Sequence, residues 1–461
     1  MPPQVRLLST TWPPICAGAL VLVAIALCAS ARGRAAAETV EVEPVWSAHP
    51  VGFSLLTDGR DQFVGYYDAS RQMSVAHRKL PSPKWTFCKL PRRTGWDSHN
   101  YVTMVMDSAG HLHLCGDMHC ARMVYFRTTR PGDITSLKRI GHMVGPERER
   151  RVTYPVFLRA PDGRLIFRYR DGGSGNGDDL YNVYDAKTRT WQRLFACALI
   201  SGQGKMNAYC TRPALGPDGR FHMVWVWRDT PDAATNHDLS YARSRDLVHW
   251  ETSAGRPLKL PITIENAEVI DPVPARGGMV NGNTRLGFDS HKRPIVTYHK
   301  FDSERHTQIY SARLEDGRWR IYQTSDWAGY RWQFGGGGAI PFEVRVGGVQ
   351  ALGDGTLALS YRYKHGSGTW VLDEKTLRPI PGRTAPKRPG RDLPPSVRKV
   401  ESKFPGMSKR ITADSGRCDE PGVRYVLAWE TLGPHRDRPR KGKLPQPSML
   451  RVIKLVAPPE R

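Results

Sequence analysis

The sequence has few acidic residues, few cysteines and, beyond residue 40, no long apolar segment at helical spacing. Asp and Glu total 44 against 68 Lys and Arg, which gives a formal net charge of +24. With 8 cysteines in 461 residues, the chain is not a small domain built around disulfides. The missing helical periodicity argues against a helical fold.

The cysteines beyond residue 40 are widely spaced: Cys88, Cys115, Cys120, Cys197, Cys210 and Cys418. An exported chain has room for one or two disulfides among them. The spacing alone does not define the pairing.

Zinc-finger, helix-turn-helix and aromatic RNA-binding signatures are also absent, which argues against nucleic acid as a partner. The excess positive charge nevertheless concentrates polyanions near the surface. An acidic polysaccharide, sulfated or rich in uronic acid, is therefore the expected partner. Part of the charge carries no such information, because it falls in a basic, Pro-rich run at about 384–412 that is typical of a solvated loop.

The N-terminal segment 1–37 has the pattern of an export signal. Arg6 provides a positive start, residues 16–29 are apolar, and small residues at 35–37 allow cleavage near Ala37. A membrane span needs about 20 apolar residues, so this run is too short for a stable span, and an uncleaved anchor is the alternative. We therefore expect a secreted or periplasmic protein with no stable membrane span once the signal is removed.

A turn containing Asp or Gly, followed by alternating apolar and aromatic residues, recurs along the chain. The copies lie at 55–68, 106–117, 160–172, 216–229, 289–302 and 352–366. Repeats of about 50 to 70 residues that feed strands covered on both faces are typical of β-propeller blades. Residues 423–432 and 448–456 complete a last blade or close the ring with N-terminal strands, which leaves no open sheet edge.

The sequence thus predicts an all-β fold, a single β-propeller of seven blades over residues 45–458. A β-sandwich followed by a second β domain is the alternative, because such a pair also has short strands and Asp-Gly turns.

Unusual polar residues gather in three segments at 95–101, 111–120 and 151–179. Within them, His99 and His119 lie 20 positions apart, and Tyr154 and Arg170 lie 16 apart. These residues, together with the segments around 207–229, 235–246 and 427–440, resemble the BNR-repeat-like family of seven-bladed propeller ulvan lyases. The resemblance covers residues 45 to 455. It implies that His99, His119, Tyr154 and Arg170 form a catalytic set.

Polysaccharide lysis gives these residue types a clear chemical use. The reaction removes the C5 proton of a uronate and expels the glycosidic oxygen at C4. Arg170 can neutralise the carboxylate with a bidentate guanidinium, helped by a hydrogen bond from a histidine. His99 and Tyr154 are then candidates for removing and returning the proton, the tyrosine with its pKa lowered by Arg170.

Each residue also has a structural interpretation. Tyr154 precedes a proline and can pack at a strand end, and Arg170 can pair with Asp171 or Asp178. His119 can bridge backbone groups between blades.

Further residues are candidates for binding the substrate: Asn100, Arg212, Arg228 and His299, with Arg285 as an additional contact for sulfate or carboxylate. Aromatic residues near strand ends could stack on sugar rings, namely Trp225, Trp227, Tyr298 and Tyr363. For the tryptophans, packing between blades is the stronger interpretation.

The proposed chemistry needs no cofactor, but a structural zinc or calcium ion is compatible with the sequence. One candidate ligand group is His111, His113, Cys115, His119 and Cys120. A second, looser group is Cys210, His222 and His237.

The leading functional hypothesis is a secreted lyase for an ulvan-like polysaccharide. A sialidase-like glycoside hydrolase is one alternative and would draw its carboxylates from Asp97, Glu265, Glu268 and Asp271. A propeller that binds glycans without turnover is the other. An unsaturated product distinguishes the lyase, and new reducing ends without unsaturation indicate the hydrolase.

Overall fold

The structure of the protein is a computed structural model that describes residues 37–386 and 393–456. The predicted signal, up to residue 36, and part of the predicted basic loop lie outside these residues. In the part of the chain that is described, no helix is long and apolar enough to cross a membrane.

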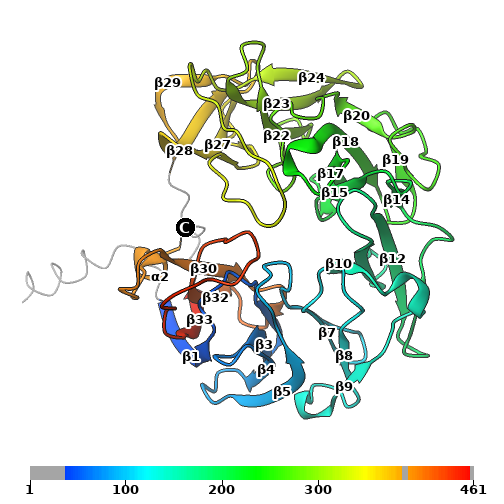
Figure 1. The fold of residues 1–461 in the computed structure, drawn as a ribbon, viewed down its shortest axis with the longest axis vertical. Helices are drawn as coiled ribbons and strands as arrows, with labels where there is room; N and C mark the ends of the chain where they lie inside the picture. The colour runs from blue at the N-terminus through cyan, green and yellow to red at the C-terminus, as the bar shows by residue number, and fades with distance from the viewer. Residues whose placement is uncertain (1–36, 387–392, 457–461) are drawn as a thin grey trace, which may run out of the picture.

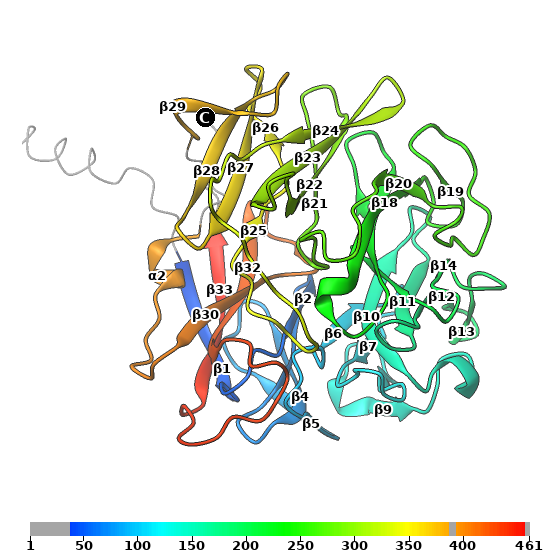
Figure 2. The same ribbon diagram turned by 45° about the horizontal axis from the view of Figure 1, so that its top comes forward.

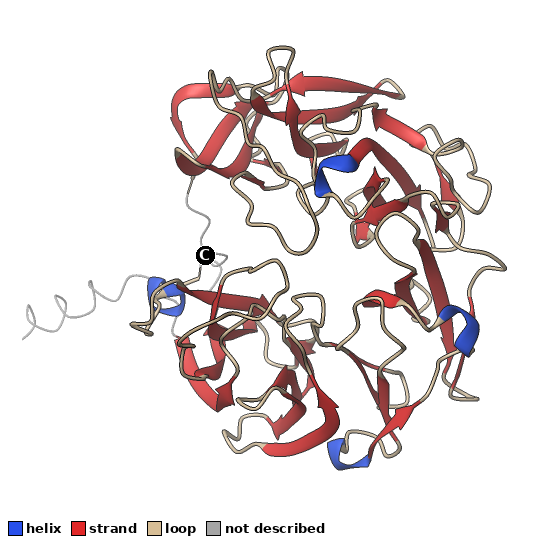
Figure 3. Ribbon diagram, viewed as in Figure 1, coloured by secondary structure: helices blue, strands red, loops and turns tan. Residues whose placement is uncertain are grey.

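Strands dominate the fold (Figure 3), and the described helical elements are single turns. They are the short helix α2 (Pro395–Arg398) and the 3-10 turns η1 (Ile134–Ser136), η2 (Pro146–Arg148) and η3 (Ala233–Thr235). The sheets stand side by side around a common centre, and in the sheets from β10 to β24 the later strands lie toward the rim (Figure 1).

The first sheets along the chain are antiparallel meanders. One contains β2 (Ser54–Gly59), β3 (Asp61–Tyr67), β4 (Gln72–Lys79) and β5 (Thr86–Arg93), with β31 (Arg417–Cys418) parallel to β2. The next contains β6 (Thr103–Met106), β7 (Leu112–Cys115), β8 (Tyr125–Thr128) and β9 (Leu137–Ile140). The third contains β10 (Val152–Arg159), β11 (Leu165–Asp171), β12 (Asp178–Asp185) and β13 (Thr190–Arg193), with β14 (Ile200–Ser201) beside β12.

The following sheets carry more strands. One has β15 (Asn207–Cys210), β16 (Ala214–Leu215), β17 (Phe221–Arg228), β18 (Asn236–Ser244), β19 (Trp250–Glu251) and β20 (Glu268–Asp271). A nine-stranded sheet begins with β21 (Arg285–Phe288), β22 (Pro294–Phe301), β23 (Thr307–Glu315) and β24 (Arg318–Gln323). It continues with β25 (Arg345–Val346), β26 (Gln350–Ala351), β27 (Thr356–Tyr363), β28 (Gly366–Asp373) and β29 (Pro379–Thr384).

The last sheet contains both ends of the described chain. Its order is β1 (Ala37–Val45), β33 (Ser448–Val456), β32 (Val423–Leu432) and β30 (Met407–Ala413), and β1 pairs antiparallel with β33 (Figure 2). The expected pairing of the C-terminal strands with an N-terminal strand is confirmed, and so is the all-β propeller.

The number of blades stays a prediction. The described strands form six hydrogen-bonded sheets, and the nine-stranded one is two antiparallel runs joined by a single parallel pair, Phe288 with Gln350.

The Asp turns found in the sequence act as predicted. The Asp107 carboxylate accepts hydrogen bonds from the backbone N–H groups of Ala109 (2.9 Å) and His111 (2.8 Å), and Asp289 does the same for His291 and Arg293. These hydrogen bonds stabilise the turn in which the chain reverses direction before the next strand. The strands that follow, such as β7, β11 and β17, are buried along nearly their whole length.

Three expectations differ from the structure. The described fold starts before residue 45, because β1 supplies the outer strand of the closing sheet. The predicted basic loop ends early, because residues 407–413 form β30, where Lys409 reaches Glu430 at 2.9 Å. All six cysteines of the described chain are free thiols, whereas the sequence left room for one or two disulfides.

Candidate functional site

His99, His119, Tyr154 and Arg170 lie together on the inner side of the second and third sheets. His99 comes from the connection between β5 and β6, and His119 from the connection between β7 and β8. Tyr154 belongs to β10 and Arg170 to the neighbouring strand β11.

The rings make a continuous series of contacts. His99 and His119 stack with centroids 4.1 Å apart, and His99 meets Tyr154 edge-on at 5.5 Å. The Arg170 guanidinium carbon lies 4.9 Å from the centroid of the Tyr154 ring. The structure therefore brings the four predicted residues into one cluster.

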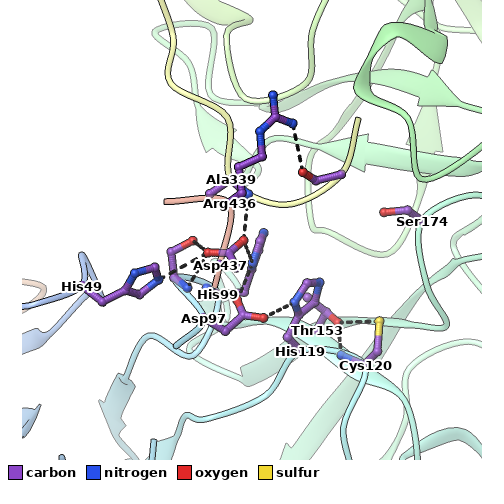
Figure 4. A network of polar contacts seen from close by, with 12 residues as sticks. His49, Asp97, His99, His119, Cys120, Thr153, Ser174, Ala339, Arg436 and Asp437 are labelled. Atoms are coloured by element: carbon purple, nitrogen blue, oxygen red, sulfur yellow. Dashed lines mark hydrogen bonds and ion pairs between the residues drawn. The ribbon is translucent and has the colours of Figure 1, made fainter. Parts of the chain in front are cut away.

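Asp97 holds both imidazoles (Figure 4). Its two oxygens meet Nδ1 of His99 at 2.7 Å and Nδ1 of His119 at 2.5 Å. Burial alone would raise the pKa of this carboxyl, but the hydrogen bonds from His119 and His99 lower it well below its ordinary value. An ionised carboxylate only accepts hydrogen bonds, so each ring carries a hydrogen on Nδ1, and Nε2 is the acceptor whenever the ring is neutral.

Tyr154 has a strained backbone. Its φ is +58°, in the left-handed region that bulky residues avoid, and the β10–β11 register shifts between Thr153 and Val156. This bulge directs the side chain toward His99. Burial and the neighbouring Tyr209 raise the pKa of the Tyr154 phenol above its ordinary value, against the lowering effect of Arg170, so the phenol keeps its proton at neutral pH. The expected lowering of this pKa is wrong.

Arg170 is 3% exposed and only partly satisfied. Its Nε donates to the Gly172 carbonyl at 3.2 Å and its Nη2 to Thr153 Oγ1 at 3.2 Å. Its Nη1 is buried with no partner among the described residues. Asp171 and Asp178, the predicted structural partners, instead bind Arg148. A buried charged donor without an acceptor is costly, so an anion that reaches Nη1 would be bound favourably.

A connection between strands of the last sheet reaches His99. Asp437, between β32 and β33, lies 3.6 Å from His99 Nδ1 and accepts hydrogen bonds from the Ser98 hydroxyl (2.8 Å) and the Ala339 backbone N–H (2.8 Å). Next to it, Arg436 donates to the carbonyl of Gly335 at 2.8 Å (Figure 4). Asp437 therefore ties the His99 segment to two other parts of the ring.

Replacing Asp437 with asparagine is expected to destabilise the fold by about 1–2 kcal/mol at pH 7. Burial raises the pKa of Asp437, but His49 and the Ser98 donors lower it to about 2. This stabilisation is complete above the unfolded pKa of about 3.9 and is lost as the pH falls toward 2. Urea unfolding of both proteins at pH 7 and pH 3 measures it.

The difference in unfolding free energy between the wild type and Asp437→Asn should be smaller at pH 3 than at pH 7. An equal difference at both pH values would show that charge is not the cause. Asp316→Asn, in an exposed turn, is the control and should change stability little.

The predicted binding residues take different positions. Asn100 is buried and donates to Thr94 Oγ1 at 3.1 Å, and His299 is 1% exposed between Trp332 and Phe334. Burial lowers the pKa of His299 to about 3, so it is a neutral interior residue.

The two predicted arginines lie closer to the cluster. Arg228 is 5.4 Å above the Tyr209 ring and is bound by loop carbonyls, and Arg212 is exposed. The stacking candidates Trp225, Trp227 and Tyr298 are buried, which confirms interior packing for the tryptophans.

Sequence reasoning missed the roles of Asp97, Asp437 and Tyr209. Asp97 lies only two positions before His99, and this short spacing is a signal that could have been used. Tyr209 connects Ser174 (2.5 Å between hydroxyls) to the Tyr154 ring (6.1 Å between centroids), and only the packing of β15 beside the β11–β12 connection reveals this.

Neither predicted zinc group assembles among the described residues. His113 instead bonds to Asp107, His222 to Asp218 and His237 to Asp229. Three possible ligand atoms do meet in two other places: Asp97, His99 and His119, and Asp289, His291 and Glu374. A structural metal ion stays a prediction.

The carboxylates considered for a hydrolase do not converge on the cluster apart from Asp97. Glu268 bonds to Ser253 and Trp319, and Asp271 lies 2.6 Å from Lys300. Glycoside hydrolysis needs a pair of carboxyl groups about 5–10 Å apart, and this site has Asp97 already bound to two histidines.

Two known proteins that resemble part of this chain are named ulvan lyases. "Ulvan lyase, long isoform" of Glaciecola sp. (strain KUL10) is 35% identical over 64 residues, which covers 14% of this chain and 6% of that protein. "Ulvan lyase, short isoform" of Alteromonas sp. (strain LOR) is 38% identical over 62 residues, which covers 13% of this chain and 12% of that protein. The chain thus matches only a small part of these curated relatives.

Solved structures match over most of the chain. The polysaccharide lyase Uly1 superposes with a TM-score of 0.57 at 13% identity, over 88% of this chain and 90% of that one. An ulvan lyase bound to GlcA(1-4)Rha3S superposes with a TM-score of 0.55 at 13% identity, over 92% and 96%. At this identity they support the fold. A family profile described as "BNR repeat-containing family member" matches residues 61–327, more than half of the sequence. The chain therefore belongs to the BNR repeat-containing family.

Proposed function

We propose that the protein is a polysaccharide lyase that cleaves a uronate-containing, sulfated polysaccharide of the ulvan type by β-elimination. Its relatives named ulvan lyase, its net charge of +24 and the residue types of the cluster support this proposal. The observation that carries it is the contact series from His119 through His99 and Tyr154 to Arg170.

Arg170 binds and neutralises the uronate carboxylate. Its Nη1 has no protein partner, and a carboxylate placed there accepts a charge-assisted hydrogen bond. Negative charge develops on the carboxylate as the C5 proton leaves, so a fixed cation stabilises the transition state more than the ground state.

The histidines provide the base. With Nδ1 donating to Asp97, Nε2 of either ring can take the C5 proton, and the carboxylate stabilises the imidazolium that forms. Tyr154 is protonated because its pKa is raised, and it donates its proton to the departing C4 oxygen. The electrons of the C5–H bond form the C4–C5 double bond as the glycosidic bond breaks.

A secreted or periplasmic location suits this substrate, because polysaccharides of this size are degraded outside the cytoplasm. The signal pattern at 1–37 supports it.

Incubation of the purified protein with ulvan tests the proposal. Ultraviolet absorbance from the new C4–C5 double bond should increase with time. New reducing ends without this absorbance would indicate hydrolysis, and binding without any product would indicate a non-catalytic propeller.

Asp97→Asn is expected to lower kcat about 10²–10³-fold on the same polymer, with little change in KM. An amide accepts from one Nδ1–H but donates to the other ring, which forces that imidazole into the tautomer with a protonated Nε2. The pH profile of kcat/KM should also change, because one histidine loses its anionic partner. Asp316→Asn is again the control. Unchanged kcat and pH profile would contradict a role for Asp97 in orienting the base.

A further inference from the structure

A cavity of about 380 Å³ opens between β15 and β16 of one sheet and β21 of the next. Its size falls in the range of about 300–1,000 Å³ that is typical of ligand pockets. Arg212 and Arg285 line it together with the hydroxyl-bearing residues Tyr209, Thr211 and Thr284. No Asp or Glu is among the described residues that line it.

Both arginines lack a carboxylate partner. Arg212 donates to the Phe157 carbonyl at 2.9 Å, and Arg285 donates to the carbonyls of Gly282 (3.1 Å) and Thr284 (2.8 Å). Within residues 37–386 and 393–456, no acidic oxygen lies within 4.0 Å of either guanidinium. These carbonyls orient the two groups but leave their charge uncompensated. Partial desolvation lowers the pKa of both arginines, in Arg212 together with the nearby Arg168, although the Arg212 side chain is exposed and that of Arg285 is partly exposed.

The positive charge continues toward the next strands. Arg345 of β25 stands directly opposite Arg362 of β27 in the antiparallel register. Arg345 is exposed, but partial desolvation still lowers its pKa to about 10, with further lowering by Arg362, Arg285 and Arg410. Like charges directly opposite one another destabilise a sheet. Arg345 and Arg362 therefore repel one another, and the charges of Arg285 on β21 and Arg410 on β30 of the last sheet add to this repulsion.

The net positive charge of the chain does not by itself explain why these arginines lie close together. Two buried arginines have acidic partners, Arg168 with Asp179 (2.8 Å) and Arg313 with Glu315 (2.6 Å), whereas Arg212, which is exposed, and Arg285, which is partly exposed, have none. Surplus cations that only promote solubility are least costly when they are far apart. A cluster that keeps them together is stabilised when an anion binds.

We propose that the cavity between β15, β16 and β21 is a sulfate-binding site, in which Arg212 and Arg285 hold a sulfate ester of the polysaccharide. The inference rests on the proposed function for the identity of the polymer. Tyr209 links the two sites, because it lines the cavity while Arg170 lies 5.8 Å above its ring. The cavity therefore takes a sugar next to the uronate that Arg170 binds, and Arg345, Arg362 and Arg410 attract the following sulfated units.

The hydrogen-bond donors that line the cavity favour a sulfate ester over a second carboxylate as its ligand. The guanidinium of Arg212, between β15 and β16, and that of Arg285, on β21, line the cavity together with the hydroxyls of Thr211 and Thr284. A tetrahedral sulfate has three free oxygens for such donors, whereas a planar carboxylate has two.

The test compares ulvan with chemically desulfated ulvan, which keeps its carboxylates. The double variant Arg212→Gln/Arg285→Gln should raise KM for ulvan about 10- to 100-fold and change KM for the desulfated polymer less than about 2-fold. Arg320→Gln, on the outer strand β24 and paired with Glu315 at 3.1 Å, is the control and should alter neither. Equal loss on both polymers, or no loss on either, would overturn the sulfate site.

Binding without turnover separates this inference from the proposed function. Calorimetric titration of the Tyr154→Phe protein with both polymers should show weaker binding after desulfation, and the Arg212→Gln/Arg285→Gln changes should abolish this difference. If the wild type makes no unsaturated product but the sulfate preference persists, the lyase proposal fails and the site stands. If the product forms but sulfation does not affect binding, the site fails and the lyase stands.

Discussion

Arg170→Lys is expected to lower kcat/KM on a uronate polymer by about 10²–10³-fold, the usual cost of removing one donor that stabilises charge in the transition state. Lysine keeps the positive charge but is a flexible point donor, whereas the guanidinium is a planar fork. Nε and Nη2 of Arg170 anchor the group to Gly172 and Thr153, and Nη1 is left for the substrate. A lysine cannot make all three contacts, so the charge moves relative to the carboxylate.

Initial rates from ultraviolet absorbance give kcat and KM for both proteins. Arg127→Lys is a matched control, because Arg127 also lies over a tyrosine ring, Tyr184 at 5.8 Å, but on β8, outside the cluster. Thermal unfolding of both variants establishes that the fold is intact. If Arg170→Lys retained more than a tenth of wild-type kcat/KM, neutralisation by Arg170 would not be the main source of catalysis.

Tyr154→Phe is expected to reduce kcat by about 10²–10⁴-fold while KM changes little. The substitution removes only the hydroxyl, and the ring contacts with His99 and Arg170 remain available to phenylalanine. Because the phenol pKa is raised, the wild-type enzyme should not lose activity through ionisation of Tyr154 below its ordinary pKa of about 10.

Tyr184→Phe, on β12, serves as the control and should keep wild-type kcat. A synthetic substrate with a good leaving group at C4 adds a second measurement. It should restore much of the activity of Tyr154→Phe, since such a group needs no proton. A large loss of kcat without this rescue would indicate that Tyr154 acts as the base and not as the proton donor.

The strand that follows each Asp turn could be predicted because the signal is local. The Asp107 carboxylate is satisfied by backbone N–H groups two and four residues later, and the alternation that follows needs no knowledge of distant residues. His299 shows the limit of this reasoning. Its strand β22 is recognisable, but both faces of that strand are covered, so the histidine is an interior residue.

Part of the cluster could be predicted from the sequence. His99, His119, Tyr154 and Arg170 lie within one stretch of the chain, and their chemistry suits a uronate. Asp437 lies more than 300 positions from Ser98, which it contacts. No local pattern relates the two, because the contact exists only once the last sheet closes the ring beside the first.

The sequence by itself determined an all-β ring, the four residue types of the cluster and a large positive charge, because turn chemistry, strand alternation and net charge are properties of short segments or of the whole composition. Only the tertiary structure decided which groups share a site. Which strands become neighbours decides three features of the site. They are the hydrogen bonds of Asp97 with two imidazoles, the unpaired Nη1 of Arg170 and the arginines that line the cavity between β15, β16 and β21. That choice is made by long-range packing, to which every sheet of the ring contributes at once.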